Sequence, residues 1–101
     1  TIMQRTAIHP GEHLAEELRE LGLSAAGLAR QIEVPVNRIT GIIKEQRSVT
    51  ADTALRLAKF FGTTPDFWMS LQSSYDVKKA RMVVGKEIER AVTSLKTLQA
   101  A

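Results

Sequence analysis

The sequence predicts an all-α domain, and two observations support this fold class. Apolar residues recur at helical spacing in successive short segments, and no stretch alternates apolar and polar residues as a half-buried strand would. Residues typical of helix ends (Ser, Thr, Pro and Gly) separate these segments. The 101 residues, 44% of them hydrophobic and 25% charged, give room for one domain with its own core.

The first two expected helices have clear ends. Pro10 suits the first position of a helix, where its missing N–H needs no partner, and Gly22 suits the residue after a helix, so we expect a helix from Pro10 to Leu21. Ser24 is a good N-cap for a second helix, about Ala25 to Ile32. Helical spacing places the following residues on the inner faces: Leu14, Leu18, Leu21, Leu28, Ala29 and Ile32.

The next two helices follow at short intervals. The third is expected to begin near Pro35 or Val36 and to run to about Glu45. Thr50 is the expected N-cap of a fourth helix from Ala51 to Phe61. The residues expected on the inner faces of these two helices are Ile39, Ile42, Ile43, Ala54, Leu55, Leu57, Ala58 and Phe61.

The last part of the chain is also expected to be helical. Thr64 is the N-cap of a fifth helix, with Pro65 in its first turn, and this helix continues to about Met82. A sixth segment, Val84 to Gln99, carries a narrow apolar stripe at helical spacing. Gly85 either separates the two segments or lies within one long helix. The stripe consists of Val84, Ile88, Ala91, Val92, Leu95 and Leu98.

All five aromatic residues lie between residues 60 and 75, so they form one cluster in the sequence. Aromatic side chains can stack on bases, but they are more often buried where helices meet. Phe61, Phe67 and Trp68 flank the short connection between the fourth and fifth helices, and we expect them in the core. Phe60 and Tyr75 remain open to either role.

A tight connection joins the second and third helices. It spans only about Glu33 to Pro35, and Val34 is disfavoured from helical backbone because it precedes a proline. Val34 also supplies the apolar residue that such a turn buries, and Ala29 is small where two steeply crossing helices must approach. This pattern predicts a helix-turn-helix.

A helix-turn-helix exposes the outer face of its second helix. Asn can read adenine, Arg and Lys can read guanine, and Thr or Val can touch a thymine methyl group. Positive charge gathers here: the stretch from Arg30 to Arg47 has a net charge of +2, whereas that from Glu12 to Glu20 has −3. The alternative is an ordinary solvated helix face, but the turn and the charge distribution favour DNA binding. The residues on this face are Val36, Asn37, Arg38, Thr40, Gly41 and Lys44, followed in the loop by Arg47 and Ser48.

Several runs of residues resemble a known family. The stretch from Leu23 to Trp68 is similar to a lambda-repressor-like, Xre-type helix-turn-helix domain of five helices, here followed by an additional C-terminal helix. The flanking motifs resemble antitoxins of the HigA/VapI type over roughly residues 8 to 80. These motifs are His9-Pro10-Gly11-Glu12, Ala51-Asp52-Thr53-Ala54-Leu55-Arg56-Leu57, Pro65-Asp66-Phe67-Trp68, Leu71-Gln72 and Tyr75-Asp76.

The resemblance implies a non-enzymatic antitoxin that dimerises, binds double-stranded operator DNA and represses its own operon. The implied partner is a small RelE-like toxin, HigB, which cleaves mRNA on the ribosome. The alternatives are a solitary Xre-type repressor without a toxin, and a protein-binding module without DNA binding. By position, the base-edge candidates are Val36, Asn37 and Thr40, Arg38 and Lys44 suit bases or phosphates, and Ser24 and Arg47 suit phosphates.

The resemblance also suggests a division of the chain. Residues 1–8 are expected to form an N-terminal tail, 9–80 the DNA-binding domain, and 81–101 a helical extension. The apolar stripe of this extension could pack on the body, form a dimer seam or bind the toxin, and we favour the seam. Glu33 occupies a turn position where the family often has Gly, so it must adopt a positive φ unless the turn is shaped differently.

Composition and motifs exclude several other functions. The chain has no cysteine, which excludes disulfides and Cys-based catalysis and suits a cytoplasmic protein. No apolar run approaches the roughly 20 residues of a membrane span. His9 to His13 matches a zinc-peptidase pattern, but Pro10 and Gly11 place His9 before the helix, where it suits a cap. We therefore expect no metal ion and no cofactor.

Overall fold

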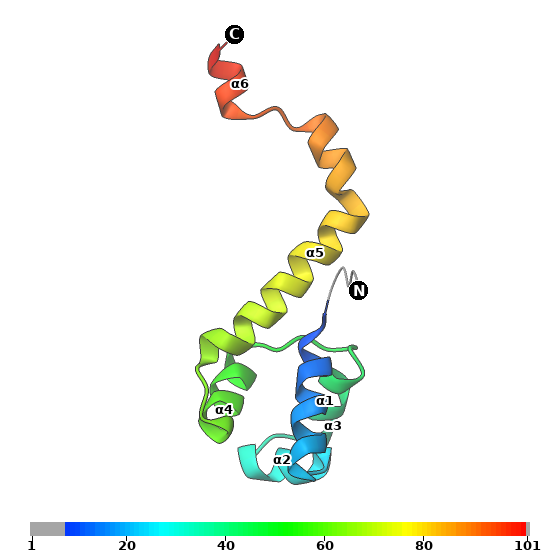
Figure 1. Cartoon of the computed structure of the whole chain (residues 1–101), viewed down its shortest axis with the longest axis vertical. Coiled ribbons are helices and arrows are strands. Elements are labelled where there is room, and N and C mark those ends of the chain that lie inside the picture. Colours follow the sequence, from blue (N-terminus) through cyan, green and yellow to red (C-terminus); the bar gives the residue numbers. More distant parts are fainter. Residues whose placement is uncertain (1–7, 101) are drawn as a thin grey trace.

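The computed structural model describes residues 8–100, which form six helices and no strand within that range (Figure 1). The predicted all-α class is confirmed. Four helices and the start of α5 form a body, from which the rest of α5 and α6 project as an arm, so the molecule measures 59 × 31 × 22 Å. The helices are α1 (Pro10–Leu21), α2 (Ala25–Ile32), α3 (Val36–Ile43), α4 (Ala51–Phe61), α5 (Pro65–Ala91) and α6 (Leu95–Ala100).

Local capping chemistry determines most of these helix ends. The side chains of Ser24, Thr50 and Thr64 each accept a backbone N–H at the start of the following helix, as the sequence predicts. Gly22 follows α1 with a φ of +63°, in the left-handed region. The structure also shows that α3 ends at Ile43 rather than near Glu45, because Glu45 itself adopts a φ of +61°.

The expected end of the fifth helix near Met82 and the expected start of the sixth at Val84 are wrong, whereas the alternative that Gly85 lies within one long helix is confirmed. α5 runs unbroken from Pro65 to Ala91, with Gly85 inside it, and the chain leaves the helix at Val92 instead. Val92 and Thr93 are β-branched, and the Ser94 hydroxyl accepts the N–H of Thr97 at 3.1 Å, as an N-cap of α6 does. The apolar stripe is therefore divided between two helices.

The predicted boundary between the DNA-binding domain and the extension, at residues 80 and 81, lies inside α5. The predicted N-terminal tail comprises residues 1–8, of which the structure describes only Ile8. The division into a DNA-binding domain and an extension thus stays a prediction. None of the helices within residues 8–100 has both the length and the apolar character needed to cross a membrane.

The core lies between α1 to α4 and the first turns of α5. Trp68 is only 1% exposed at its centre, and its indole N–H donates to the Thr63 hydroxyl at 3.0 Å. Phe61 is partly buried against it, as expected. The remaining apolar core residues are Leu14, Leu18, Leu28, Ala29, Ile32, Ile39, Ile42, Val49, Ala54, Leu57 and Ala58.

Three residues expected inside are exposed: Leu21 (57%), Leu55 (60%) and Phe67 (37%). Leu21 is the last residue of α1, directly before the left-handed Gly22. In α4 the buried face is formed by residues 53, 54, 57 and 58, and Leu55 lies outside that sector. Phe67 covers the edge of the core, where its ring meets His13 at 5.2 Å between ring centroids.

A close approach fixes α1 against α3. A Cβ atom built on Gly11 would lie 1.9 Å from the backbone carbonyl oxygen of Ile42. No side chain fits there, so only glycine allows the first turn of α1 to contact the end of α3.

Candidate nucleic-acid interface

The turn between α2 and α3 has the predicted helix-turn-helix geometry. Glu33 adopts a φ of +59°, so the turn keeps its shape although glycine is absent. The Val34 N–H donates to the carbonyl of Ala29 at 3.0 Å, and the Val34 side chain packs against the core. Ala29 is buried where the two helices meet. This turn directs one face of α3 inward and the other outward.

Most of the predicted base-reading residues lie on the outer face of α3. Ile39 and Ile42 face the core and are fully buried, whereas Asn37 is exposed and Val36 is 47% exposed. Lys44, also exposed, is the residue that directly follows α3. Thr40 and Gly41 are half-buried at the edge of the same face. The arrangement presents an amide, a hydroxyl and an apolar group side by side, which suits contacts to base edges.

A hydrogen bond to Gln72, on α5, fixes the end of the loop that follows α3. The Val49 N–H donates to Gln72 Oε1 at 2.8 Å, and Gln72 Nε2 donates to Asp76 Oδ1 at 2.9 Å. Gln72 is 4% exposed, so this bond fixes the end of the loop that carries Arg47 and Ser48. Sequence reasoning gave Gln72 no role. The available signal was its position four residues after Trp68, on the buried side of α5.

The Arg47 side chain packs against α3 at Gly41. A Cβ atom on Gly41 would lie 3.3 Å from Arg47 Cβ and 3.4 Å from Arg47 Cδ, so the aliphatic part of Arg47 lies across the helix at this point. The loop thus places the exposed Arg47 side chain beside the outer face of α3. The absence of a side chain at Gly41 leaves room for the aliphatic part of Arg47.

Ser24 has a structural role in the free protein. Its hydroxyl oxygen accepts the N–H of Gly27 at 2.9 Å as the N-cap of α2, and the residue is exposed. An N-cap at an exposed helix start is also a place where phosphate oxygens can bind, because unpaired N–H groups point outward there. The phosphate contact of Ser24 stays a prediction.

Arg38 is held by a partner on α4. Its Nη1 donates to Asp52 Oδ2 at 2.6 Å, and the same oxygen accepts from Arg56 Nε at 3.0 Å. Hydrogen bonds from Arg56 and then from Arg38 lower the pKa of Asp52, so its carboxylate is ionised at neutral pH. Sequence reasoning assigned Arg38 to DNA and did not foresee this pairing.

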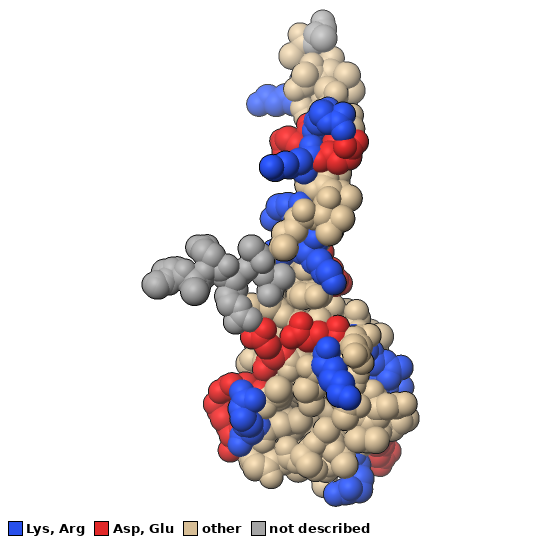
Figure 2. Space-filling model, turned by 90° about the vertical axis from the view of Figure 1, so that its right-hand side faces the viewer, with Lys and Arg blue, Asp and Glu red and all other residues tan. Residues whose placement is uncertain are grey.

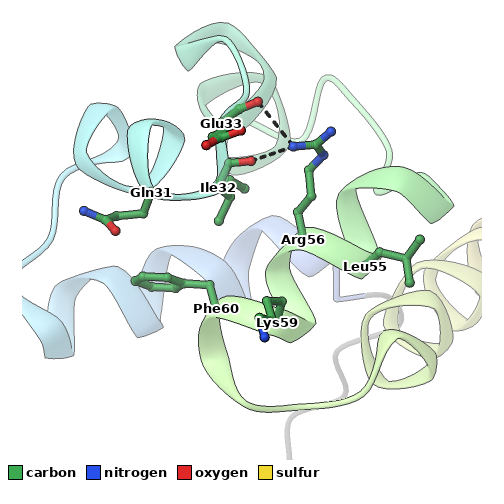
Figure 3. Close-up of a pocket in the computed structure, with 7 residues that line it drawn as sticks. All are labelled: Gln31, Ile32, Glu33, Leu55, Arg56, Lys59 and Phe60. Carbon is green, nitrogen blue, oxygen red and sulfur yellow. Dashed lines mark hydrogen bonds between the residues drawn. The ribbon is translucent and has the colours of Figure 1, made fainter.

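Arg56 also ties α4 to the helix-turn-helix. Its Nη1 donates to the Ile32 carbonyl at 2.8 Å and lies 3.3 Å from the Glu33 carbonyl. Figure 3 shows Arg56 extending from α4 toward these carbonyls beside a shallow groove. Cations are favoured at the carboxyl end of a helix, so Arg56 stabilises the end of α2. The groove is lined by Gln31, Ile32, Glu33, Leu55, Arg56, Lys59 and Phe60.

The two histidines serve packing and capping. His9 Nδ1 accepts the Gly11 N–H at 2.9 Å as the N-cap of α1, and its ring meets Tyr75 edge-on at 4.7 Å. Burial, at 3% exposure, lowers the pKa of His9 and outweighs the surrounding carboxylates. Within residues 8–100 no three His, Cys, Asp or Glu side chains gather closely enough to hold a metal ion. The charged groups around His9 are Glu12, Glu45, Asp76 and Lys79.

The turn, the exposed polar face of α3 and the anchored basic loop define a helix-turn-helix protein, a non-enzymatic DNA-binding class. The chain belongs to the helix-turn-helix family HTH_3, which matches residues 14–68, more than half of its length. The antitoxin resemblance seen in the sequence motifs is confirmed by close relatives among HigA proteins.

Three of these relatives are informative. Virulence-associated protein I of Dichelobacter nodosus is 52% identical over 75 residues, covering 73% of this chain and 69% of that protein. An addiction module antidote protein of the HigA family from Coxiella burnetii has 59% identity and a TM-score of 0.85, covering 86% of this chain and 96% of that one. Pseudomonas aeruginosa antitoxin HigA, solved with the higBA promoter, has 44% identity and a TM-score of 0.85, covering 87% and 97%.

Proposed function

We propose that this chain is a sequence-specific DNA-binding antitoxin that represses its own operon as a dimer and neutralises a RelE-like, mRNA-cleaving toxin of the HigB type. The proposal rests above all on the outer face of α3, where exposed Val36 and Asn37 precede the partly exposed Thr40. The helix-turn-helix family and the HigA relative solved with its promoter support DNA as the ligand.

The side chains divide between base reading and phosphate binding. Asn37 pairs with adenine, while Thr40 and Val36 contact thymine methyl groups in the major groove. Lys44 and Arg47 bind phosphates on one side of α3, and Ser24 binds a phosphate at the start of α2. Arg38 contributes a base-edge or phosphate contact from the same helix.

DNA reading is tested with two kinds of variant. We expect the double variant Asn37→Ala, Thr40→Ala to lose much of its preference for the operator over a scrambled duplex, because both residues are assigned to base edges and not to phosphates. We expect Arg47→Ala to weaken binding to both duplexes alike and to reduce the salt dependence by about one phosphate contact. Fluorescence anisotropy at several salt concentrations measures both effects.

Arg19→Ala is the matched control for Arg47→Ala. It removes the same charge from α1, where Arg19 is exposed and paired with Glu16. We expect its operator affinity to stay close to that of the wild type. Unchanged discrimination by the double variant would refute the assigned reading face, and salt-independent binding would favour a protein-binding module.

The arm supplies the surface for dimerisation. One α3 reads few bases, and two copies about 34 Å apart would read successive major grooves. None of the apolar stripe packs on the body: Val84, Ile88, Val92, Leu95 and Leu98 are all exposed. On α5, Val84, Ile88 and Ala91 share one helical face. Figure 2 shows uncharged surface between the charged clusters of the arm, as a seam between two copies requires.

The dimer is tested by measuring mass in solution. We expect light scattering to give the mass of two chains of 11.2 kDa each. Ile88→Glu places a charge in the proposed seam and should yield monomers with weaker operator binding. Leu55→Glu is the control, since it changes an exposed apolar residue on the body (60% exposed, against 51% for Ile88) and should leave a dimer. A dimeric Ile88→Glu variant would place the seam elsewhere.

The toxin partner is tested by co-purification followed by an activity assay. We expect the tagged chain to recover a small RelE-like protein in stoichiometric amounts from its native cells. Adding the chain to a translation extract should then stop mRNA cleavage by that protein. Recovery of the chain with DNA alone would instead identify the solitary Xre-type repressor.

A further inference from the structure

Three charged side chains connect α3, the recognition helix of the proposed DNA contact, to α4. Arg38, in the N-terminal half of α3, donates to Asp52 in the first turn of α4, and Asp52 also accepts from Arg56. Arg56 is in turn bonded to the Ile32 carbonyl at the end of α2. The chain of bonds therefore runs from α2 through α4 to α3 and sets the position of Arg38 relative to the whole helix-turn-helix.

We propose that Asp52 is a positioning residue for DNA recognition, which fixes the Arg38 guanidinium so that it contacts a base edge rather than binding phosphates at random. The inference rests on the proposed function and assigns a specific part of its selectivity to a residue outside the recognition helix. The base that suits a guanidinium in the major groove is guanine, through its O6 and N7 atoms.

Geometry supports this role. The bond to Asp52 uses Nη1, and a guanidinium carries five N–H groups in a rigid plane. Fixing one side of that plane therefore directs the N–H groups of the other side. An arginine side chain loses considerable rotamer entropy when it binds a ligand. Because Asp52 already restricts Arg38 in the free protein, less entropy is lost when Arg38 contacts DNA.

Electrostatics separates this role from simple phosphate attraction. The carboxylate of Asp52 lies against Arg38 and Arg56, so it offsets part of their positive charge. A negative charge near the interface weakens attraction to every phosphate, whatever the sequence. The charge of Asp52 is thus expected to lower affinity for every duplex alike, whereas its hold on Arg38 raises affinity for the correct site alone, and only this second effect increases discrimination.

The exposed fractions of the two side chains allow Asp52 to hold Arg38 and still leave Arg38 accessible to DNA. The Arg38 side chain keeps 30% of its surface and that of Asp52 keeps 56%, so the pair lies at the surface and Arg38 remains accessible to DNA. A fully buried pair could not reach DNA, and a fully exposed arginine would not be held in one orientation. Arg38 lies between these limits.

The test compares Asp52→Asn with a closely matched control, Asp66→Asn. Both aspartates are exposed, and each occupies the second residue of a helix that begins after a threonine N-cap, in α4 and α5 respectively. Both variants lose the same charge from the same position of a helix. Of the two aspartates, only Asp52 contacts Arg38 and Arg56, so a difference between the variants reports on these two contacts.

The probes are a duplex selected by the wild-type protein from a randomised library and a scrambled version of it. We expect Asp52→Asn to bind the selected duplex about 5-fold more weakly or worse, the lower end of the value of a bidentate base contact. Its affinity for the scrambled duplex should be unchanged or higher. Asp66→Asn should match the wild type on both duplexes, and circular dichroism checks that each variant is folded.

A double-mutant cycle gives a readout that a merely structural role would not produce. In an Arg38→Ala background, Asp52→Asn should cause no further loss of discrimination, because the side chain that it positions is absent. An equal loss with and without Arg38, or an equal change on both duplexes, would overturn the inference. Tighter binding of Asp52→Asn to the selected duplex would also overturn it, since Asp52 would then only oppose phosphate attraction.

The same experiment separates this inference from the proposed function. If the wild-type protein selects no sequence and binds all duplexes alike, the proposed function fails and this inference fails with it. If the wild type discriminates but Asp52→Asn behaves as Asp66→Asn does, only the role of Asp52 is refuted.

Discussion

Replacing Gly11 by alanine tests how the recognition helix is held in place. The new Cβ would lie 1.9 Å from the Ile42 carbonyl oxygen and 3.1 Å from Ile43 Cα. All of these atoms belong to the backbone or are fixed to it, so no change of rotamer relieves the clash. The first turn of α1 must move away from the end of α3, and the contact between the two helices is lost.

The size of the effect follows from this geometry. Overpacking a core typically costs about 1–3 kcal/mol, and a clash between backbone atoms belongs at the upper end. Alanine regains up to about 1 kcal/mol through its higher helix propensity. We therefore expect Gly11→Ala to lower the free energy of unfolding by about 2 kcal/mol, which for a domain of this size lowers the Tm by about 8–16 °C.

Thermal unfolding followed by circular dichroism measures this change, and urea unfolding at 25 °C gives an independent value. Gly85→Ala is the control, because its Cβ would meet only the flexible Arg81 side chain, 3.0 Å from its Cγ and 3.8 Å from its Cβ. Gly85 lies within α5, so alanine should keep or increase stability there. A Tm of Gly11→Ala within about 2 °C of the wild type, well below the shift of about 4–8 °C per kcal/mol, would refute the reasoning.

Two further predictions concern other buried polar groups of the body. Gln72→Leu leaves the Val49 N–H without its hydrogen-bond acceptor. We expect urea unfolding to give a free energy of unfolding lower by about 1–3 kcal/mol, together with weaker DNA binding. An unchanged free energy of unfolding would mean that water replaces the bond. Because burial lowers the pKa of His9, the unfolded chain binds a proton more readily, so stability should decrease as pH falls through about 6.5. His9→Asn keeps an N-cap without this titration, and its stability should fall less than that of the wild type between pH 7.5 and 5.5; equal losses would assign the pH dependence to other groups.

Residues close together in the sequence account for what could be predicted. Most helix starts were predicted because caps such as Ser24 and Thr50 bond to groups three residues away. The helix-turn-helix was predicted for the same reason, since Val34 and Pro35 act on their own backbone. The break at Val92 was not predicted although its signal is local. The sequence suggested a break only at Gly85, with one long helix as the alternative, and Ser94 was not identified as an N-cap.

Side-chain burial was predictable only in part. The helical period identified the apolar stripes correctly, but the sector of each helix that becomes covered depends on where its neighbours lie. Leu55 is exposed and Thr53 is buried for this reason, although both lie on α4. The outer face of α3 was recognised because its inner face, with Ile39 and Ile42, is unmistakably apolar.

The helices, the tight turn and the residue types on α3 could be predicted from the sequence, because capping, periodicity and proline act over a few residues. The pairing of charges and amides, in contrast, depends on tertiary packing. Arg38 and Asp52 are 14 residues apart, and Val49 and Gln72 are 23 apart. Such contacts depend on how whole helices pack, and no local rule of spacing connects residues so distant along the chain.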